Sequence, residues 1–228
     1  MPAIQPRTPW MAGWGPSSYH PGSSRESVCQ NRAEKERSQV MKQAIKHPFF
    51  LEREDALLAV IDVQEKLFAA MDQQEKMVRN IGSLVRTAQR LHLPIVVTEQ
   101  YPQGLGPTIP PLKELLGEVA PLSKLTFSCC RTEHFQSRLK EVGKRQVILT
   151  GMEAHICVLQ TALDLLQAGF SVHIPLDAVC SRRKENWKVA MVQLKMAGAV
   201  ITCAETVAFE LLREAGTEDF KVLSRLFR

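Results

Sequence analysis

The sequence has no long hydrophobic run, no extended block of like charges and few cysteines. No apolar segment approaches the ~20 residues that cross a bilayer, so we expect a soluble protein without a membrane partner. The formal net charge of +5 is modest and its basic residues are scattered among acidic ones, which argues against a nucleic-acid partner. Six cysteines in 228 residues form no disulfide framework and indicate free thiols in a reducing compartment, so we expect the cytoplasm.

Residues 1–45 are rich in Pro, Gly, Ser and charged residues and show no hydrophobic period. Such a segment cannot bury enough apolar surface to offset the cost of ordering, so we predict a disordered extension. It lacks the apolar central region of a secretory signal. An organelle transit peptide, an upstream extension before a start at Met41 and a docking motif around Trp10 and Trp14 stay open. Residues 46–228 are predicted to form the folded domain.

Short apolar runs alternate with helical patterns through this domain. The runs are "LLAVID", "PIVVTE", "PLSKLT", "QVILTG", "SVHIPLD" and "AVITC", and one long helical pattern covers residues 65–91. Continuous rather than alternating apolar strands are typical of a parallel sheet that is buried on both faces. The repeated strand–helix units therefore predict a three-layer, doubly wound α/β fold with about six strands, mostly parallel.

Three reactive side chains fall where such a fold binds ligands, beyond the carboxyl ends of its strands. Asp62 ends the first apolar run, Lys124 lies in the third, and Cys157 follows the fourth at the start of a predicted helix. Each also has an ordinary interpretation, as a helix cap, an exposed lysine or a packed core cysteine. A helix N-terminus favours the thiolate, which is the nucleophilic form of cysteine.

Other polar residues form weaker candidate sites. A substrate pocket is predicted to include Gln64, Glu99, Gln100 and Tyr101. Cys129, Cys130 and His134 lack the C-x₂₋₄-C spacing of structural zinc sites, and the glycines near residue 105 form no phosphate-binding motif. We therefore expect neither a metal nor a cofactor.

Three segments together resemble the isochorismatase-like hydrolase superfamily, also called the cysteine hydrolases. They are "LLAVIDVQ", "SKLTFS" and "LTGMEAHICVLQTALDLLQAGF", and the resemblance spans about residues 56–209. In the family's motifs, Asp62 matches the aspartate after the first strand. Lys124 and Ser128 match a K-x-x-x-S segment, and Gly151, Cys157, Val158 and Thr161 match a G-x-x-x-x-x-C-V-x-x-T segment. The "QYPQGLGPT" and "GMEAHIC" segments are similar to the isochorismatase-domain-containing and YcaC-like branch.

The resemblance implies a mechanism and a homo-oligomer. Asp62 would act as general base on the Cys157 thiol, Lys124 would orient the pair, and attack on a carbonyl would give a thioester. A cis peptide bond at Met152–Glu153 would place the backbone N–H groups of Glu153 and Cys157 as an oxyanion hole.

Two differences from the family's patterns bear on the substrate. The segment "TEQYPQGLGPT" has no D-x-H metal-binding motif, which argues against a zinc-dependent nicotinamidase. Isochorismatases cleave a vinyl ether without needing the cysteine, so Cys157 favours carbonyl chemistry. The leading hypothesis is a hydrolase of a small amide, carbamoyl or related carbonyl compound. The alternatives are isochorismate-type ether hydrolysis and a non-catalytic oligomeric binding or scaffold protein.

Overall fold

The computed structural model describes Arg32 and residues 47–227. The chain divides into two units, Met1–Lys46 and His47–Arg228. Of the first unit only Arg32, an exposed helical residue, is described, so the predicted disorder of residues 1–45 lies outside the described residues. The second unit carries the sheet and the helices that cover it.

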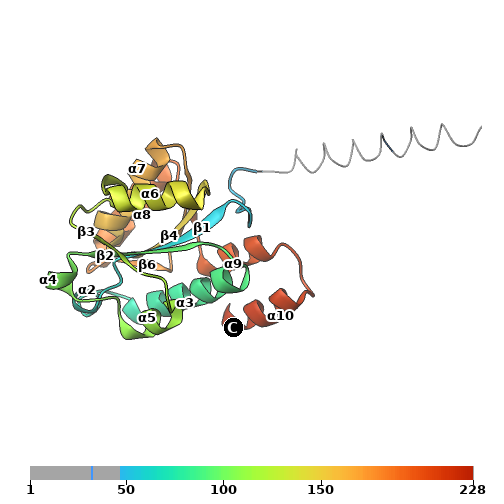
Figure 1. Ribbon diagram of the computed structural model, residues 1–228, viewed down its shortest axis with the longest axis horizontal. Helices are drawn as coiled ribbons and strands as arrows, with labels where there is room; N and C mark the ends of the chain where they lie inside the picture. Colours follow the sequence, from blue (N-terminus) through green and yellow to red (C-terminus); the bar gives the residue numbers. More distant parts are fainter. Residues whose placement is uncertain (1–31, 33–46, 228) are drawn as a thin grey trace, which may run out of the picture. The chain divides into compact units, whose positions relative to one another are not determined.

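A parallel sheet forms the centre of this unit (Figure 1). Its seven strands are β1 (Ala56–Ile61), β2 (Ile95–Gln100), β3 (Leu122–Lys124), β4 (Gln146–Met152), β5 (Ser171–Pro175), β6 (Val179–Cys180) and β7 (Val200–Thr202). They run in the order β3-β2-β1-β4-β5-β7, and β6 pairs with β4. From β1, the sheet extends to one side through β2 and β3 and to the other through β4 and β5, so its topological switch point lies between β1 and β4.

The predicted doubly wound fold is confirmed, with one strand more than expected. The additional strand is β6, whose two residues are too few to form a recognisable apolar run. The predicted helical stretch over residues 65–91 is instead two helices, α2 (Glu65–Phe68) and α3 (Gln74–Arg90). The break follows from Gln73, which adopts a left-handed backbone conformation with φ of 55° that a right-handed helix cannot continue through.

Helices cover both faces of the sheet (Figure 1). One face carries α6 (Glu133–Val142), α7 (Leu159–Gln167) and α8 (Lys184–Met196). The opposite face carries α3, α5 (Pro110–Leu116), α9 (Ala204–Leu212) and α10 (Glu218–Leu223). Shorter elements complete the unit: α4 (Pro102–Leu105), the 3₁₀ turns η1 (Cys129–Arg131) and η3 (Ser224–Phe227), and the π-helical turn η2 (Ala154–Val158).

The sheet separates two hydrophobic cores, and β1 contributes to both because alternate side chains of a strand point to opposite faces. Leu58 and Val60 pack in the core beneath α3, whereas Leu57 and Ala59 pack in the core beneath α7. Helix α3 buries residues at helical spacing: Met77, Ile81, Leu84, Val85 and Ala88. No helix among the described residues is long and apolar enough to span a membrane.

Candidate active site

Two residues from the carboxyl ends of separate strands form a buried ion pair. Asp62 follows β1, Lys124 ends β3, and Lys124 Nζ lies 2.6 Å from Asp62 Oδ2. Asp62 is 0% exposed and Lys124 is 4% exposed. Burying two charges costs several kcal/mol per ion unless hydrogen bonds satisfy their remaining donors and acceptors. The pair therefore depends on the polar groups around it.

Lys124 finds these groups on β2 and on the segment that follows β3. Its Nζ donates to Gln100 Oε1 at 2.7 Å and lies 3.3 Å and 3.2 Å from the carbonyl oxygens of Thr126 and Phe127. Gln100 is the register partner of Lys124 in the β2–β3 ladder, so the two side chains are neighbours. Gln100 Nε2 donates to the Leu125 carbonyl at 2.8 Å, which leaves Oε1 facing the ammonium. The sheet register thus sets the position of the ammonium group.

The second oxygen of the Asp62 carboxylate is held by Thr98 on β2. Thr98 Oγ1 donates to Asp62 Oδ1 at 2.7 Å. The backbone of Asp62 is left-handed, with φ of 53°, a conformation that Asp tolerates better than most residues. Gln64 N donates to the Asp62 carbonyl at 2.8 Å in the turn that follows. Because Thr98 and Lys124 occupy the carboxylate, the interpretation of Asp62 as a helix cap is wrong.

Cys157 lies in η2, between β4 and α7, rather than in the first turn of a regular helix. Cys157 is 5% exposed, and its thiol interacts electrostatically with the Asp62 carboxylate. Asp62 therefore interacts with both the ammonium of Lys124 and the thiol of Cys157. The peptide bond between Met152 and Glu153, where β4 meets η2, is cis.

Gly151 allows the approach of β4 to the end of β1. It pairs with Ile61, the residue before Asp62, and its φ is 109°. A Cβ at this position would overlap the Ile61 backbone carbonyl. Glycine is the residue that combines a positive φ with such a close backbone contact.

Burial and the neighbouring charges set the protonation states. Burial raises the pKa of the Cys157 thiol, the charge of Asp62 raises it further, and the charge of Lys124 opposes only part of this. Burial alone would lower the pKa of Lys124, but the charge of Asp62, followed by the charges of Cys129 and Cys157 and the hydrogen bond to Asp62, together raise the pKa, so the ammonium persists. We expected a helix N-terminus to favour the thiolate. The structure instead keeps a neutral thiol, which needs a base to become a nucleophile.

The family model named Isochorismatase domain matches residues 55–206.

The chain belongs to the isochorismatase family.

Among its relatives, isochorismatase domain-containing protein 2 of Danio rerio is 39% identical over 178 residues, which cover 77% of this chain and 88% of that protein. Among solved structures, the MAR1 ribonuclease of Caenorhabditis elegans has a TM-score of 0.73 at 38% identity, covering 78% of this chain and 91% of that chain. The YcaC gene product of Escherichia coli is described as an octameric hydrolase of unknown specificity. It has a TM-score of 0.73 at 27% identity, and the match covers 78% of this chain and 89% of that chain.

The predicted pocket residues of this isochorismatase domain are Gln64, Glu99, Gln100 and Tyr101. Two of them, Gln64 and Glu99, support the loop that follows β2. Gln64 Nε2 donates to the carbonyl oxygens of Gln100 and Gly106 at 3.0 Å and 2.6 Å. Glu99 Oε1 accepts hydrogen bonds from Thr108 N and Oγ1, each at 2.7 Å. Tyr101 is 51% exposed where the chain leaves β2. Direct contact of these four with a substrate stays a prediction.

Two further motif residues connect the Lys124 segment to the helix that follows Cys157. Ser128 Oγ donates to Asp164 Oδ2 on α7 at 2.7 Å, and Thr161 Oγ1 accepts from Cys129 N at 3.0 Å. Both Ser128 and Thr161 are buried. The serine and threonine of the isochorismatase motifs therefore join the two halves of the site.

Sequence reasoning missed Thr98, and it considered Cys129 only as a possible zinc ligand, an interpretation that its spacing did not support. Thr98 was recognisable as a polar residue at the carboxyl end of an otherwise apolar strand. Cys129 is buried beside it, with Sγ 3.8 Å from Thr98 Oγ1, and burial followed by the charge of Asp62 raises its pKa to about 11. In the part of the chain that the structure describes, no three His, Cys, Asp or Glu side chains form a metal-binding group.

Proposed function

We propose that the protein is a cysteine hydrolase that cleaves a small amide, carbamoyl or related carbonyl compound through a thioester on Cys157. The observation that carries this proposal is the position of Asp62. One carboxylate pairs with the Lys124 ammonium and interacts electrostatically with the Cys157 thiol, and all three groups are buried at the carboxyl edge of the sheet. A scaffold protein has no need of a buried ion pair joined to a thiol.

The raised pKa of Cys157 makes base assistance necessary in the first half of the reaction. Asp62 accepts the thiol proton as Sγ forms a bond to the substrate carbonyl carbon, and the carbonyl π electrons move to oxygen. When the tetrahedral intermediate collapses, the C–N bond breaks and the proton held by Asp62 passes to the departing nitrogen. The products of this half are an amine and an acyl group on Cys157.

Water completes the cycle in the second half. Asp62 accepts a proton from water as its oxygen attacks the thioester carbon. Collapse breaks the C–S bond, and the same proton returns to sulfur, so the acid is released and the thiol is restored. Lys124 keeps its proton throughout, because its raised pKa holds it as a cation that fixes and electrostatically supports Asp62. The oxyanion hole assigned by resemblance to the N–H groups of Glu153 and Cys157 is part of this proposal.

We also propose a homo-oligomer. The octamer described for YcaC of Escherichia coli supports this, as does an apolar stripe on the outer face of α8. Its residues Val189, Val192 and Met196 recur at helical spacing and are 57%, 58% and 83% exposed. Light scattering after gel filtration should show a multimer, and Val192→Lys should shift it toward the monomer if this stripe is an interface.

A panel of small amides and carbamoyl compounds tests the reaction. For a substrate that the wild type hydrolyses, Cys157→Ala and Asp62→Asn should each lower kcat by at least about a thousandfold. Losses of this size are typical when one residue of a set formed by a nucleophile and its base is removed. Cys203→Ala, which changes a cysteine on another part of the sheet edge, is the matched control. Activity on isochorismate that survives Cys157→Ala would favour ether hydrolysis. Because one relative is named a ribonuclease, RNA belongs in the panel, and Cys157-dependent RNA cleavage would contradict the proposal.

A further inference from the structure

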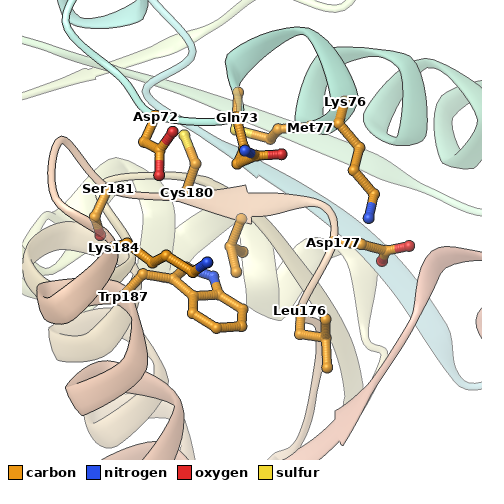
Figure 2. A pocket seen from close by; sticks show the side chains of 11 residues that line it. Asp72, Gln73, Lys76, Met77, Leu176, Asp177, Cys180, Ser181, Lys184 and Trp187 are labelled. Atoms are coloured by element: carbon orange, nitrogen blue, oxygen red, sulfur yellow. The ribbon is translucent and has the colours of Figure 1, made fainter.

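A cavity lies at the carboxyl edge of the sheet, apart from the Asp62–Lys124–Cys157 site (Figure 2). It is enclosed by the start of α3, the β5–β6 turn and the first turns of α8, and its volume is about 270 Å³. This is slightly below the ~300–1,000 Å³ of pockets for drug-sized ligands, so a smaller molecule suits it. None of the three candidate catalytic side chains lines it.

The interior of this cavity is apolar. Met77, Val179 and Cys180 are buried beneath it, and the half-buried indole of Trp187 forms a wall. Burial, followed by the charges of Glu153 and Asp72, raises the pKa of Cys180 to about 12. A thiol that stays neutral packs as an apolar group rather than reacting. These surfaces suit a hydrocarbon or aromatic body.

The rim carries charges of both signs. Among the described residues, the side chains of Asp72, Lys76 and Lys184 have neither an ion-pair nor a hydrogen-bond partner. Asp177, the fourth charged residue, is already used in the fold, because its Oδ1 accepts from Ala204 N at 2.8 Å. Figure 2 shows Lys184 beside the Trp187 indole, with Asp72 and Lys76 extending from the α3 side.

We propose that this cavity binds a small zwitterion with an apolar body, such as a free amino acid with an aromatic side chain. The ammonium group pairs with Asp72, the carboxylate pairs with Lys184, and the side chain lies against Trp187. A purely anionic ligand would meet the unpaired Asp72, and a purely cationic one would meet the two lysines. A ligand that carries both charges matches all of these groups.

The cavity also adjoins the segment that holds the nucleophile. Cys180 pairs with Met152 in the β4–β6 ladder, and Ser181 Oγ lies 3.0 Å from His155 Nδ1 in η2. The Ser181 carbonyl in turn accepts from Asp72 N at 3.2 Å. The ligand site is therefore distinct from the catalytic groups but shares a backbone framework with them.

The test is a titration monitored by NMR at the indole N–H of Trp187, with phenylalanine, phenethylamine and hydrocinnamate as probes. Trp187→Phe assigns the signal. Each probe with a single charge lacks one of the two ion pairs that phenylalanine makes. Because a partly exposed ion pair contributes little, we expect phenylalanine to bind about two- to fivefold more tightly than either of these probes. Asp72→Asn should weaken phenylalanine and phenethylamine but not hydrocinnamate. Lys184→Gln should weaken phenylalanine and hydrocinnamate but not phenethylamine.

Two controls make the result decisive. Lys188→Gln removes an exposed lysine of α8 that does not line the cavity, and should leave all three affinities unchanged. Cys157→Ser should bind phenylalanine as the wild type does. The proposal is overturned if no probe moves the Trp187 signal, if Asp72→Asn and Lys184→Gln leave the order of affinities intact, or if Cys157→Ser abolishes binding.

Discussion

Replacing Lys124 with Met is the most informative perturbation of the buried pair. The substitution keeps most of the side-chain volume and removes the ammonium 2.6 Å from Asp62 Oδ2. Asp62 is 0% exposed, and among the residues that the structure describes only Thr98 then donates a hydrogen bond to its carboxylate. Removing one partner of a buried ion pair costs about 3–5 kcal/mol. Three other acceptors also lose their donor, among them Gln100 Oε1, so we expect the upper half of that range.

Urea denaturation near pH 7 measures this free energy of unfolding. The pKa of Lys124 is raised in the folded state. Its contribution to the free energy of unfolding is therefore fully present below the pKa of the unfolded state and is lost only as pH rises through the pKa of the folded state. Asp62→Asn tolerates the left-handed backbone and completes a double-mutant cycle. The double variant should cost about 1–3 kcal/mol less than the sum of the single variants. Lys113→Met, on the exposed face of α5, should stay within about 0.5 kcal/mol of the wild type. A cost below about 1 kcal/mol for Lys124→Met, or an additive cycle, would refute the reasoning.

Three further predictions concern other parts of the domain. Burial lowers the pKa of His173 to about 4, so on acidification the unfolded state takes up this proton at a higher pH than the folded state does. The free energy of unfolding should therefore fall by up to about 3 kcal/mol between pH 6.5 and 4. Urea melts of His173→Leu should lack that part of the loss. Gly151→Ala should destabilise by about 3–5 kcal/mol because of the Ile61 contact, whereas Gly198→Ala, with a similar φ in open space, should cost about 1–2 kcal/mol in thermal or urea melts. Gln100→Leu should lower stability by about 1–3 kcal/mol and lower kcat/KM, because Lys124 and the Leu125 carbonyl each lose a hydrogen-bond partner. Unchanged kinetics would show that Gln100 does not belong to the site.

Much of the site was predictable because strand ends are visible in a sequence. A parallel sheet brings its carboxyl ends to one edge, so Asp62, Lys124 and Cys157 could be placed near one another from the runs that precede them. The structure joins them through Asp62. The family resemblance added their proposed roles, which apolar patterns alone do not supply.

The remaining features depend on contacts that no local pattern encodes. Gln64 and Glu99 were predictable as polar strand-end residues, but their partners, Gly106 and Thr108, come from the path of the following loop. The raised pKa of Cys157 arises from the depth of burial and the proximity of Asp62. A sequence window around the cysteine indicates only a helix N-terminus, which predicts the opposite direction.

Trapping the acyl-enzyme is the measurement that bears most directly on Cys157 as the nucleophile. The protein would be mixed with p-nitrophenyl acetate, the burst of p-nitrophenolate followed, and the acetylated peptide located by mass spectrometry after rapid acid quenching. We predict a burst with the acetyl group on Cys157, absent in Cys157→Ala, strongly slowed in Asp62→Asn and unchanged in Cys203→Ala. A burst that persists in Cys157→Ala, or acetylation that Asp62→Asn does not slow, would contradict an Asp62-activated Cys157 nucleophile.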